Sequence, residues 1–265
     1  MITVIIPAYN CEKFIGQALR SAVRQTVEED LEILVIDDCS TDHTGERVKQ
    51  FISRYQAKEG EPGGSGPQEG RLYKREISYL KNPANLGVAE TRNAGIRKAK
   101  GAFIAFLDGD DWWDSEKLKK QLTLIREKKG VLVYTGRELM QPSGEPAGKV
   151  ISVPADADYN SLLRTNCIPC SSVLMKTEVA REFYMCHDEL HEDYILWLRV
   201  LKKYGKAYGI NEPLLKSRLS QGGKSRNKLK SAKMHYGVYK FMGIPTWKAV
   251  WLFLCYAVNG VRKYR

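Results

Sequence analysis

The sequence contains no long apolar run and few cysteines. Its longest hydrophobic stretch, residues 249–258, is much shorter than the roughly 20 apolar residues that a membrane-spanning helix needs. No basic segment precedes the short apolar run at residues 2–6, so a signal peptide is not expected. Six irregularly spaced cysteines in 265 residues are too few for a disulfide scaffold, which favours a reducing compartment. We therefore expect a cytoplasmic protein.

Acidic residues are nearly absent from the last quarter of the chain. Residues 197–265 hold sixteen Lys or Arg against one acid, Glu212, although the formal net charge of the whole chain is only +11. The basic character therefore belongs to this segment alone, where it favours an anionic surface such as lipid, nucleic acid or phosphate. Because no nucleic-acid recognition motif accompanies the charge, we expect no nucleic-acid partner.

The first half of the chain alternates between short apolar runs and amphipathic stretches. Strands buried on both faces are predicted at residues 2–6, 31–36, 77–80, 102–107 and 131–135. Helices are predicted at residues 14–23, 86–99 and 116–129, where apolar residues recur at helical spacing. This alternation predicts an α/β fold, Rossmann-like, with a mostly parallel central sheet and helices on both faces.

The pattern changes after residue 135. Pro- and Gly-rich residues 140–148 predict a hairpin into a strand at 149–153, and residues 192–204 predict a helix. A stretch rich in Gly, Ser and Lys at 217–228 precedes two terminal helices, and residues 57–71, rich in Gly, Pro and Glu, predict a solvated loop.

Polar and acidic residues follow the predicted strands where each one ends. Tyr9 and Asn10 follow the first strand, Asp38 the second and Asp108 the fourth. In an open parallel sheet these ends lie at the edge where ligands bind. Acids gathered there repel one another unless a cation joins them, and carboxylates suit Mg²⁺ or Mn²⁺. Neither a G-x-G-x-x-G loop nor a P-loop motif is present, which argues against dinucleotide-binding and P-loop folds.

Five sequence blocks resemble those of glycosyltransferase family 2, whose members have the GT-A fold. The blocks are V-I-I-P-A-Y-N (4–10), V-I-D-D-C-S-T-D (35–42), N-L-G-V-A-E-T-R-N-A-G-I (85–96), F-I-A-F-L-D-G-D-D-W-W (103–113) and H-E-D-Y-I-L-W-L-R (191–199). They occur in the family's order over residues 1–210. The resemblance implies a catalytic domain at 1–210, with a nucleotide-binding half (1–130) and an acceptor-binding half (131–210). A basic lid and amphipathic helices are expected at 211–265.

The resemblance also implies a nucleotide site. Its expected residues are Pro7, Ala8, Tyr9, Asn10, Asp38, Asn85, Gly87, Arg92, Asp108 and Gly109. Tyr9 would stack on the base, and Asp38 would accept a hydrogen bond from the imide N–H of a uracil or thymine ring. Gly87 would allow close backbone approach, and Arg92 would pair with an acid or a phosphate.

The metal and the general base follow from the same resemblance. Asp110, with Asp108, corresponds to the D-x-D pair that holds Mn²⁺ or Mg²⁺ and the diphosphate. Asp193 corresponds to the general base that takes a proton from the acceptor hydroxyl, and a single displacement of this kind inverts the anomeric centre. A helix N-terminal carboxylate that interacts with the helix dipole is the alternative role for Asp193.

Three further features remain open at the level of sequence. Cys167 and Cys170, with Cys186, His187 and His191, have a spacing that could hold zinc, although the family needs none. Arg218 or Lys224 could face the phosphates from a lid. Trp247, Val250, Trp251, Leu254 and Val258 share one helical face, which suits either a membrane interface or packing on the catalytic domain.

The combined prediction is an inverting, metal-dependent enzyme that transfers a sugar from a UDP-sugar, or less readily a dTDP-sugar, to a hydroxyl. A lipid-linked oligosaccharide acceptor in capsule, exopolysaccharide or O-antigen synthesis is expected, with the protein held peripherally at the inner face of the cell membrane. Two alternatives are a sugar-nucleotide nucleotidyltransferase and a non-catalytic nucleotide- or glycan-binding module. The first would need a Gly-rich loop with Arg and Lys after the first strand. The second would need the loss of an acid that is present here.

Overall fold

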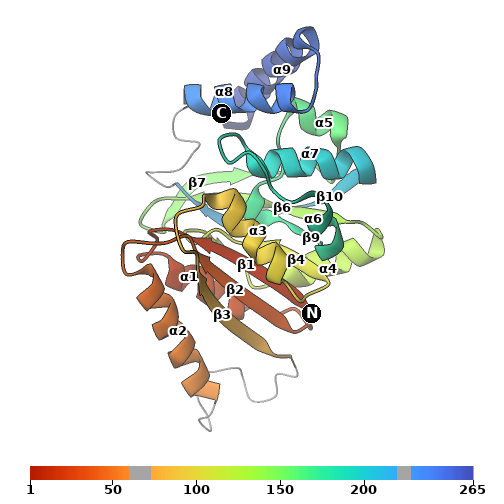
Figure 1. Cartoon of the computed structure of the whole chain (residues 1–265). Helices are drawn as coiled ribbons and strands as arrows, with labels where there is room; N and C mark the ends of the chain where they lie inside the picture. The colour runs from red at the N-terminus through yellow and green to blue at the C-terminus, as the bar shows by residue number, and fades with distance from the viewer. Residues whose placement is uncertain (60–72, 220–227, 265) are drawn as a thin grey trace.

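A computed structural model describes residues 1–59, 73–219 and 228–264. Ten strands form one sheet (Figure 1). They are β1 (Ile2–Ala8), β2 (Leu31–Asp37), β3 (Arg75–Lys81), β4 (Phe103–Phe106), β5 (Trp112–Trp113), β6 (Leu132–Met140), β7 (Pro146–Ile151), β8 (Asp156–Asp158), β9 (Leu174–Lys176) and β10 (Lys206–Arg218). Their order is β3-β2-β1-β4-β9-β6-β10-β5, with β7 beside β6 and β8 beside β10.

The expected mostly parallel GT-A sheet is confirmed in its nucleotide-binding half. Strands β3, β2, β1 and β4 run parallel to one another, and β6 runs parallel to β10. The short strand β9 lies antiparallel between β4 and β6 and joins the two halves. Three residues carry too little periodicity for a sequence pattern to reveal such a strand.

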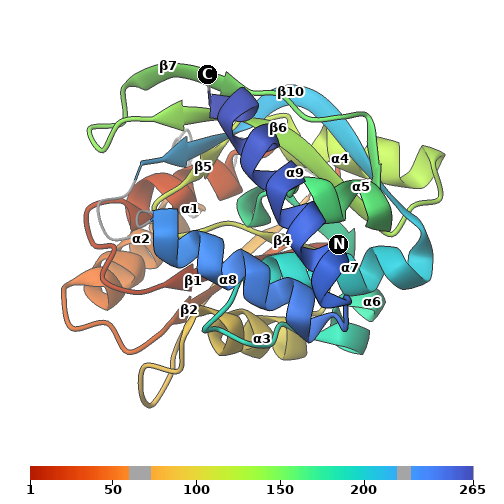
Figure 2. The ribbon, with the colours of Figure 1, turned by 90° about the horizontal axis from the view of Figure 1, so that it is seen from above.

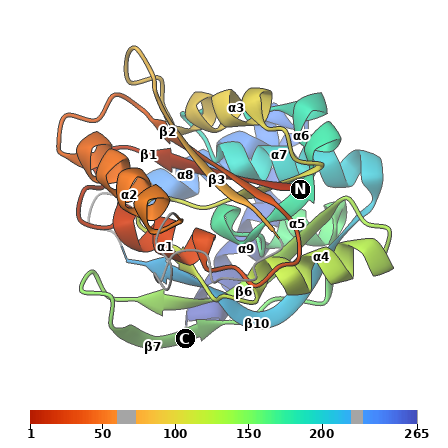
Figure 3. The ribbon, with the colours of Figure 1, turned by 90° about the horizontal axis from the view of Figure 1, so that it is seen from below.

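Helices cover both faces of the sheet. On one face lie α1 (Ile15–Val23), α2 (Thr44–Glu59) and α4 (Lys117–Glu127), as the view from below shows (Figure 3). The other face carries α3 (Val88–Lys98), α6 (Thr177–Phe183) and α7 (Glu192–Tyr204). Beyond these lie α5 (Tyr159–Arg164), α8 (Lys228–Phe241) and α9 (Thr246–Tyr264) (Figure 2). A hydrophobic core lies on each face of the sheet, and alternate residues of β1 pack into one or the other. Ile5 packs on the α3 side and Val4 on the α1 side.

Two sequence expectations need correction. The strand predicted at 77–80 exists within β3, but it lies at the edge of the sheet and is only partly buried, because none of the described strands pairs with its outer side. The boundary between 210 and 211 falls inside β10, whose second half still pairs with β6 and β5. Most of the loop expected at 57–71 lies outside the described residues, and α2 continues to Glu59.

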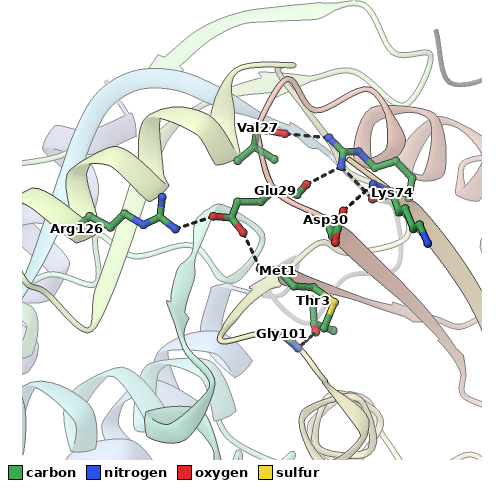
Figure 4. A network of polar contacts seen from close by, with 9 residues as sticks. Met1, Thr3, Val27, Glu29, Asp30, Lys74, Gly101 and Arg126 are labelled. Carbon is green, nitrogen blue, oxygen red and sulfur yellow. Dashed lines mark hydrogen bonds and ion pairs between the residues drawn. The ribbon is translucent and has the colours of Figure 1, made fainter. Parts of the chain in front are cut away.

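The edge of the sheet opposite the expected site is fixed by a polar network (Figure 4). The Met1 amine lies 2.6 Å from Glu29 Oε2, and Arg126 Nη2 lies 2.6 Å from Glu29 Oε1. The buried guanidinium of Arg75 donates to the carbonyl oxygens of Glu29 and Val27. These bonds satisfy backbone carbonyls in the turn before β2 and so set the register of the first strands.

Candidate active site

The loops that follow β1 and β2 are tied together at the carboxyl edge of the sheet. Pro7 and Ala8 are buried, whereas the Tyr9 side chain is 51% exposed and open to a stacking partner. Asn10 adopts a left-handed conformation with φ of 47°, and its Oδ1 accepts from the Thr41 amide at 2.9 Å. The Asp38 amide donates to the Ala8 carbonyl at 2.8 Å. The ends of β1 and β2, which carry Tyr9 and Asp38, therefore lie side by side at this edge of the sheet.

Asp38 organises the next loop through its carboxylate. Its Oδ1 accepts from Asn82 Nδ2 at 2.9 Å and from the Leu86 amide at 2.8 Å, and its Oδ2 accepts from the Gly87 amide at 2.9 Å. Because a carboxylate oxygen has two acceptor positions, Oδ2 keeps one for a further donor such as an imide N–H. That recognition of a base stays a prediction.

Gly87 lies against the loop that precedes α7. Its φ of 83° is a conformation that favours glycine, and a Cβ would come within 2.7 Å of Asp188 Oδ2. Asp188 Oδ1 in turn accepts from the Ala89 amide at the start of α3. The adjacent Asn85 is exposed to solvent. The loop before α7 therefore rests on the 85–89 segment.

Arg92 connects the strand-end acids to the acceptor half. Its side chain is buried, and Nη2 lies 2.6 Å from Asp108 Oδ1 while Nη1 lies 2.8 Å from Glu192 Oε1. The expected pairing of Arg92 with an acid is observed, but with two acids rather than one. Because the guanidinium is planar and each terminal nitrogen binds a different carboxylate, both carboxylates are fixed in direction as well as in distance.

The segment after β4 concentrates negative charge. The Asp108 amide donates to Ser171 Oγ, and a Cβ on Gly109 would come within 2.8 Å of Cys11 Sγ, so only glycine fits there. Burial, and then the charge of Asp108, raises the pKa of Asp110 to about 6. Burial and the charges of Asp110 and Asp108 also raise the pKa of Asp111. Burial and the neighbouring negative charges therefore disfavour the ionised forms of Asp110 and Asp111.

The residues present fit a divalent cation shared with a substrate. No group of three or more His, Cys, Asp or Glu side chains that could enclose a metal occurs among the described residues. Mg²⁺ and Mn²⁺ need no such enclosure, since one or two carboxylates and the oxygens of a bound diphosphate complete their shell. Asp108 and Asp110 supply hard oxygen ligands of that kind. The zinc alternative for Cys167, Cys170 and Cys186 finds no such group among the described residues, where these three cysteines form no disulfide.

Asp193 lies in the first turn of α7, next to the residue that Arg92 holds. Its Oδ1 accepts from the Tyr194 amide at 2.7 Å, which is the interaction expected of a carboxylate at a helix N-terminus. Burial, and then the charge of Glu192, raises the pKa of Asp193 to about 6. A carboxylate with that pKa can accept a proton near neutral pH, so the two roles considered for Asp193 are compatible.

Arg218 is anchored within the protein at the end of β10. Its amide donates to Asp111 Oδ1 at 2.9 Å, and Nε donates to the Asp110 carbonyl at 3.0 Å. Nη1 donates to the Pro142 carbonyl and Nη2 to Gln17 Oε1, while the guanidinium lies over the rings of Phe14 and Trp112. A phosphate-facing role would require Arg218 to give up these bonds. Lys224, the other predicted lid cation, lies outside the described residues.

The sequence analysis missed the role of Ser171. This residue lies in the 3₁₀ turn η1 (Cys170–Ser172), where its Oγ accepts from the Asp108 amide and its carbonyl accepts from Trp113 Nε1 at 2.7 Å. Both contacts join segments about sixty residues apart. No local sequence pattern identifies a serine that accepts hydrogen bonds from a distant segment of the chain.

Comparison with known proteins identifies the family of the chain. The family model described as glycosyl transferase family 2 matches residues 3–153, which is more than half of the chain. The chain belongs to glycosyl transferase family 2. This glycosyltransferase is 33% identical over 264 residues to TuaG of Bacillus subtilis (strain 168), named for teichuronic acid biosynthesis, covering 99% of this chain and 97% of the relative. It is 30% identical to WfaP of Escherichia coli, covering 100% of this chain and 95% of WfaP. WfaP is named as a UDP-Glc:α-D-GlcNAc-diphosphoundecaprenol β-1,3-glucosyltransferase.

Solved structures show the same fold. Residues 1–349 of TarS from Staphylococcus aureus, in complex with UDP-GlcNAc, superpose with a TM-score of 0.67 at 20% identity. That match covers 91% of the glycosyltransferase described here and 64% of the TarS chain. The mannosyltransferase PcManGT from Pyrobaculum calidifontis, in complex with GDP-Man and Mn²⁺, gives a TM-score of 0.66 at 18% identity, covering 92% of this chain and 65% of PcManGT. The GT-A fold expected from the sequence blocks is thereby confirmed.

Proposed function

We propose that this glycosyltransferase transfers a sugar from a UDP-sugar to an acceptor hydroxyl with inversion and with the help of a divalent metal. The bond between the sugar C1 and the diphosphate oxygen breaks as the acceptor oxygen attacks C1 from the opposite face. Asp193 takes the acceptor proton, and UDP leaves with the bonding electron pair. When bound by Asp108 and Asp110, Mn²⁺ or Mg²⁺ supplies the positive charge that stabilises the leaving diphosphate.

The observation that carries this proposal is the contact of Arg92 with both Asp108 and Glu192. One buried guanidinium thereby holds the donor-side D-x-D segment and the first turn of α7, which carries Asp193, through its two terminal nitrogens. A displacement with inversion needs a leaving-group site and a base around one sugar, and two segments held this close together support that arrangement. The donor is proposed as a UDP-sugar because TarS, with the same fold, was solved with UDP-GlcNAc.

The acceptor is proposed to be a lipid-linked diphosphate sugar. WfaP, and WfgD of Escherichia coli at 31% identity over 267 residues, are both named for a diphosphoundecaprenol-linked GlcNAc acceptor. A role in capsule, exopolysaccharide or O-antigen assembly is part of this proposal, and a lipid-linked acceptor resides in a membrane. The enzyme must therefore work at a lipid surface.

The outer face of α9 suits that surface. Trp247 is 77% exposed and Trp251 50% exposed, and Val250, Leu254 and Val258 continue the same stripe. The inner face, with Ala249 and Leu252, is buried on the domain, so packing on the domain and an exposed apolar face occur together. Neither α8 nor α9 contains an acidic residue, and Lys248 is exposed beside the stripe. We propose peripheral binding to the anionic inner face of the cell membrane. No helix in the described parts of the chain is long and apolar enough to cross a bilayer.

The decisive experiment measures UDP release from a panel of UDP- and dTDP-sugars. Each is tested with Mn²⁺, Mg²⁺ or EDTA, using GlcNAc diphosphate linked to a synthetic polyprenyl chain as acceptor. We expect one donor to react, only with metal, and Asp110→Asn to abolish the reaction. Absence of both turnover and Mn²⁺-dependent UDP binding in the wild type would refute the proposal. Asp114→Asn, which alters an acid outside the D-x-D pair, is the matched control.

A further inference from the structure

The two C-terminal helices form a hairpin that is seated on the acceptor side of the site. Seen from above, α8 and α9 lie over α7 and α5 (Figure 2). Val238 and Tyr239 of α8 and Ala249 and Leu252 of α9 are buried in the same core as the α7 residues. Tyr239 Oη donates to the Leu163 carbonyl at 2.7 Å and so joins α8 to α5. The hairpin is thus a fixed part of the domain rather than an appendage.

His235 of α8 forms the centre of the contact with α7. Its ring stacks on Tyr194 with centroids 4.8 Å apart and on Tyr256 with centroids 3.7 Å apart, both nearly parallel. Its Nε2 lies 2.9 Å from Tyr239 Oη. Burial, and then the nearby His191, lowers the pKa of His235 to about 3. The ring is therefore neutral at physiological pH, and its flat faces serve packing.

A second contact reaches the residue just before the helix. His191 Nε2 lies 3.2 Å from the carbonyl oxygen of Ser231 and 3.3 Å from its Oγ. Since a carbonyl oxygen only accepts, Nε2 carries the proton in this contact. His191 is the N-cap residue of α7, so α8 holds the point at which that helix begins.

These two contacts bracket the proposed base. Asp193 lies between His191, held by Ser231, and Tyr194, held by the His235 ring. The first turn of a helix lacks part of its backbone bonding and is the part that frays most readily. Contacts with α8 on both sides of Asp193 limit that fraying.

We propose that the α8–α9 hairpin positions the general base, with His235 and Ser231 as positioning residues that hold segment 191–194 in its reactive arrangement. This inference rests on the proposed function, in which Asp193 takes the acceptor proton. The helix pair that offers an apolar face to lipid thereby also shapes the acceptor side of the site. Neither positioning residue touches a substrate.

The test compares His235→Leu with His235→Phe. Leu removes the flat ring from the Tyr194–Tyr256 stack, whereas Phe keeps it. Asn259→Ala is the control, because Asn259 Nδ2 bonds Thr165 Oγ1 at 2.7 Å and joins α9 to α5 without touching segment 191–194. Transfer from the UDP-sugar used by the wild type to the polyprenyl diphosphate GlcNAc is measured below the unfolding temperature of every variant.

We expect His235→Leu to lower kcat about ten- to a hundredfold, because small displacements of a catalytic group cost rates of that order. The donor KM and the Mn²⁺-dependent Kd for UDP should change less than about twofold, and His235→Phe should recover most of kcat. An unchanged kcat in His235→Leu, or a loss of donor affinity that parallels the loss of kcat, would overturn the inference. So would an equal loss of kcat in Asn259→Ala.

Amide hydrogen exchange provides a readout that needs no turnover. We expect faster exchange at residues 192–196 in His235→Leu than in the wild type, with no such change in Asn259→Ala. If the wild type fails to transfer any sugar, the proposed function falls while this measurement still tests the hairpin. Unchanged exchange in His235→Leu would refute the positioning role whatever the substrate.

Discussion

Arg92 and Glu192 meet across 2.8 Å, and this contact joins two segments that are one hundred residues apart in the chain. The same guanidinium holds Asp108 at 2.6 Å, so one buried cation lies between the donor-side acids and the helix that carries the base. Two carboxylates that flank one planar guanidinium are fixed relative to each other. The geometry of the site therefore depends on Arg92 more than on any loop.

Replacing Arg92 with Met should cost about 3–5 kcal/mol of stability, because it leaves the buried Glu192 carboxylate and the partly exposed Asp108 carboxylate without their cation. Arg92→Lys should rescue little, since an ammonium cannot hold two carboxylates in the geometry of a fork. Thermal unfolding and UDP release measure the two effects. Arg97→Ala, which removes an exposed ion pair with Glu90 on the same helix, is the control and should stay near wild type. A stable, active Arg92→Met would contradict the bridging role.

Asp193→Asn should lower kcat by about 10²- to 10⁴-fold, as expected for the loss of a general base, and leave Mn²⁺-dependent UDP affinity intact. Steady-state kinetics and UDP titration separate these effects. If UDP affinity fell as steeply as turnover, Asp193 would belong to the donor site instead.

The same base predicts the pH dependence of the rate. Asp193 must be ionised to act, and its pKa is raised to about 6, so kcat should rise with pH through about 6 and fall below it. Glu192→Gln removes a neighbouring negative charge, which should shift this acidic limb to lower pH. Rate profiles between about pH 5 and 8 measure the shift. A limb that moves to higher pH in Glu192→Gln would exclude this electrostatic account.

The double change Trp247→Ser and Trp251→Ser should weaken binding to anionic vesicles by at least about tenfold, since each buried aromatic contributes about 2 kcal/mol. Unfolding temperature should change little, because Trp247 is 77% exposed and Trp251, whose ring lies under Arg164, is 50% exposed. Sedimentation with phosphatidylglycerol vesicles measures the effect, and the binding should also weaken with added salt. Val150→Ser alters an equally exposed apolar residue on β7 and serves as control. Equal binding by the double variant and the wild type would remove α9 from the membrane proposal.

Substitutions of Arg218 can distinguish a structural anchor from a phosphate ligand. If Arg218 anchors the Asp110–Asp111 segment, neither Met nor Lys can replace it, and both Arg218→Met and Arg218→Lys should bind Mn²⁺–UDP several-fold more weakly than the wild type. Isothermal titration measures the affinity, and Lys206→Ala, an exposed cation on the same strand, is the control. If Arg218→Lys keeps wild-type affinity while Arg218→Met loses it, the charge itself faces the phosphates and the lid prediction is supported.

The parallel part of the fold could be predicted from the sequence because β1, β2 and β4 are buried strands, and each of them is a short run of apolar residues. The ends of these strands then placed Tyr9, Asp38 and Asp108 at one edge, since parallel strands finish on the same side of a sheet. The helix predicted at 192–204 matches α7. The edge position of β3, the strands β5, β8 and β9, and the extension of β10 past residue 210 were not predictable, because pairing with distant strands decides them.

The sequence by itself determined the fold class, the family blocks and the candidate acids, because these rest on local periodicity and on residues close together in the chain. Tertiary structure alone decided which acids share Arg92, that Ser171 supports Asp108, and that Arg218 is anchored rather than free. It also showed that α9 packs on the domain through one face and leaves its aromatic stripe exposed on the other. Arg92 and Asp108 are 16 positions apart, and the other hydrogen-bonded pairs lie 63 to 108 positions apart, so only the folded chain brings these residues into hydrogen-bonding distance.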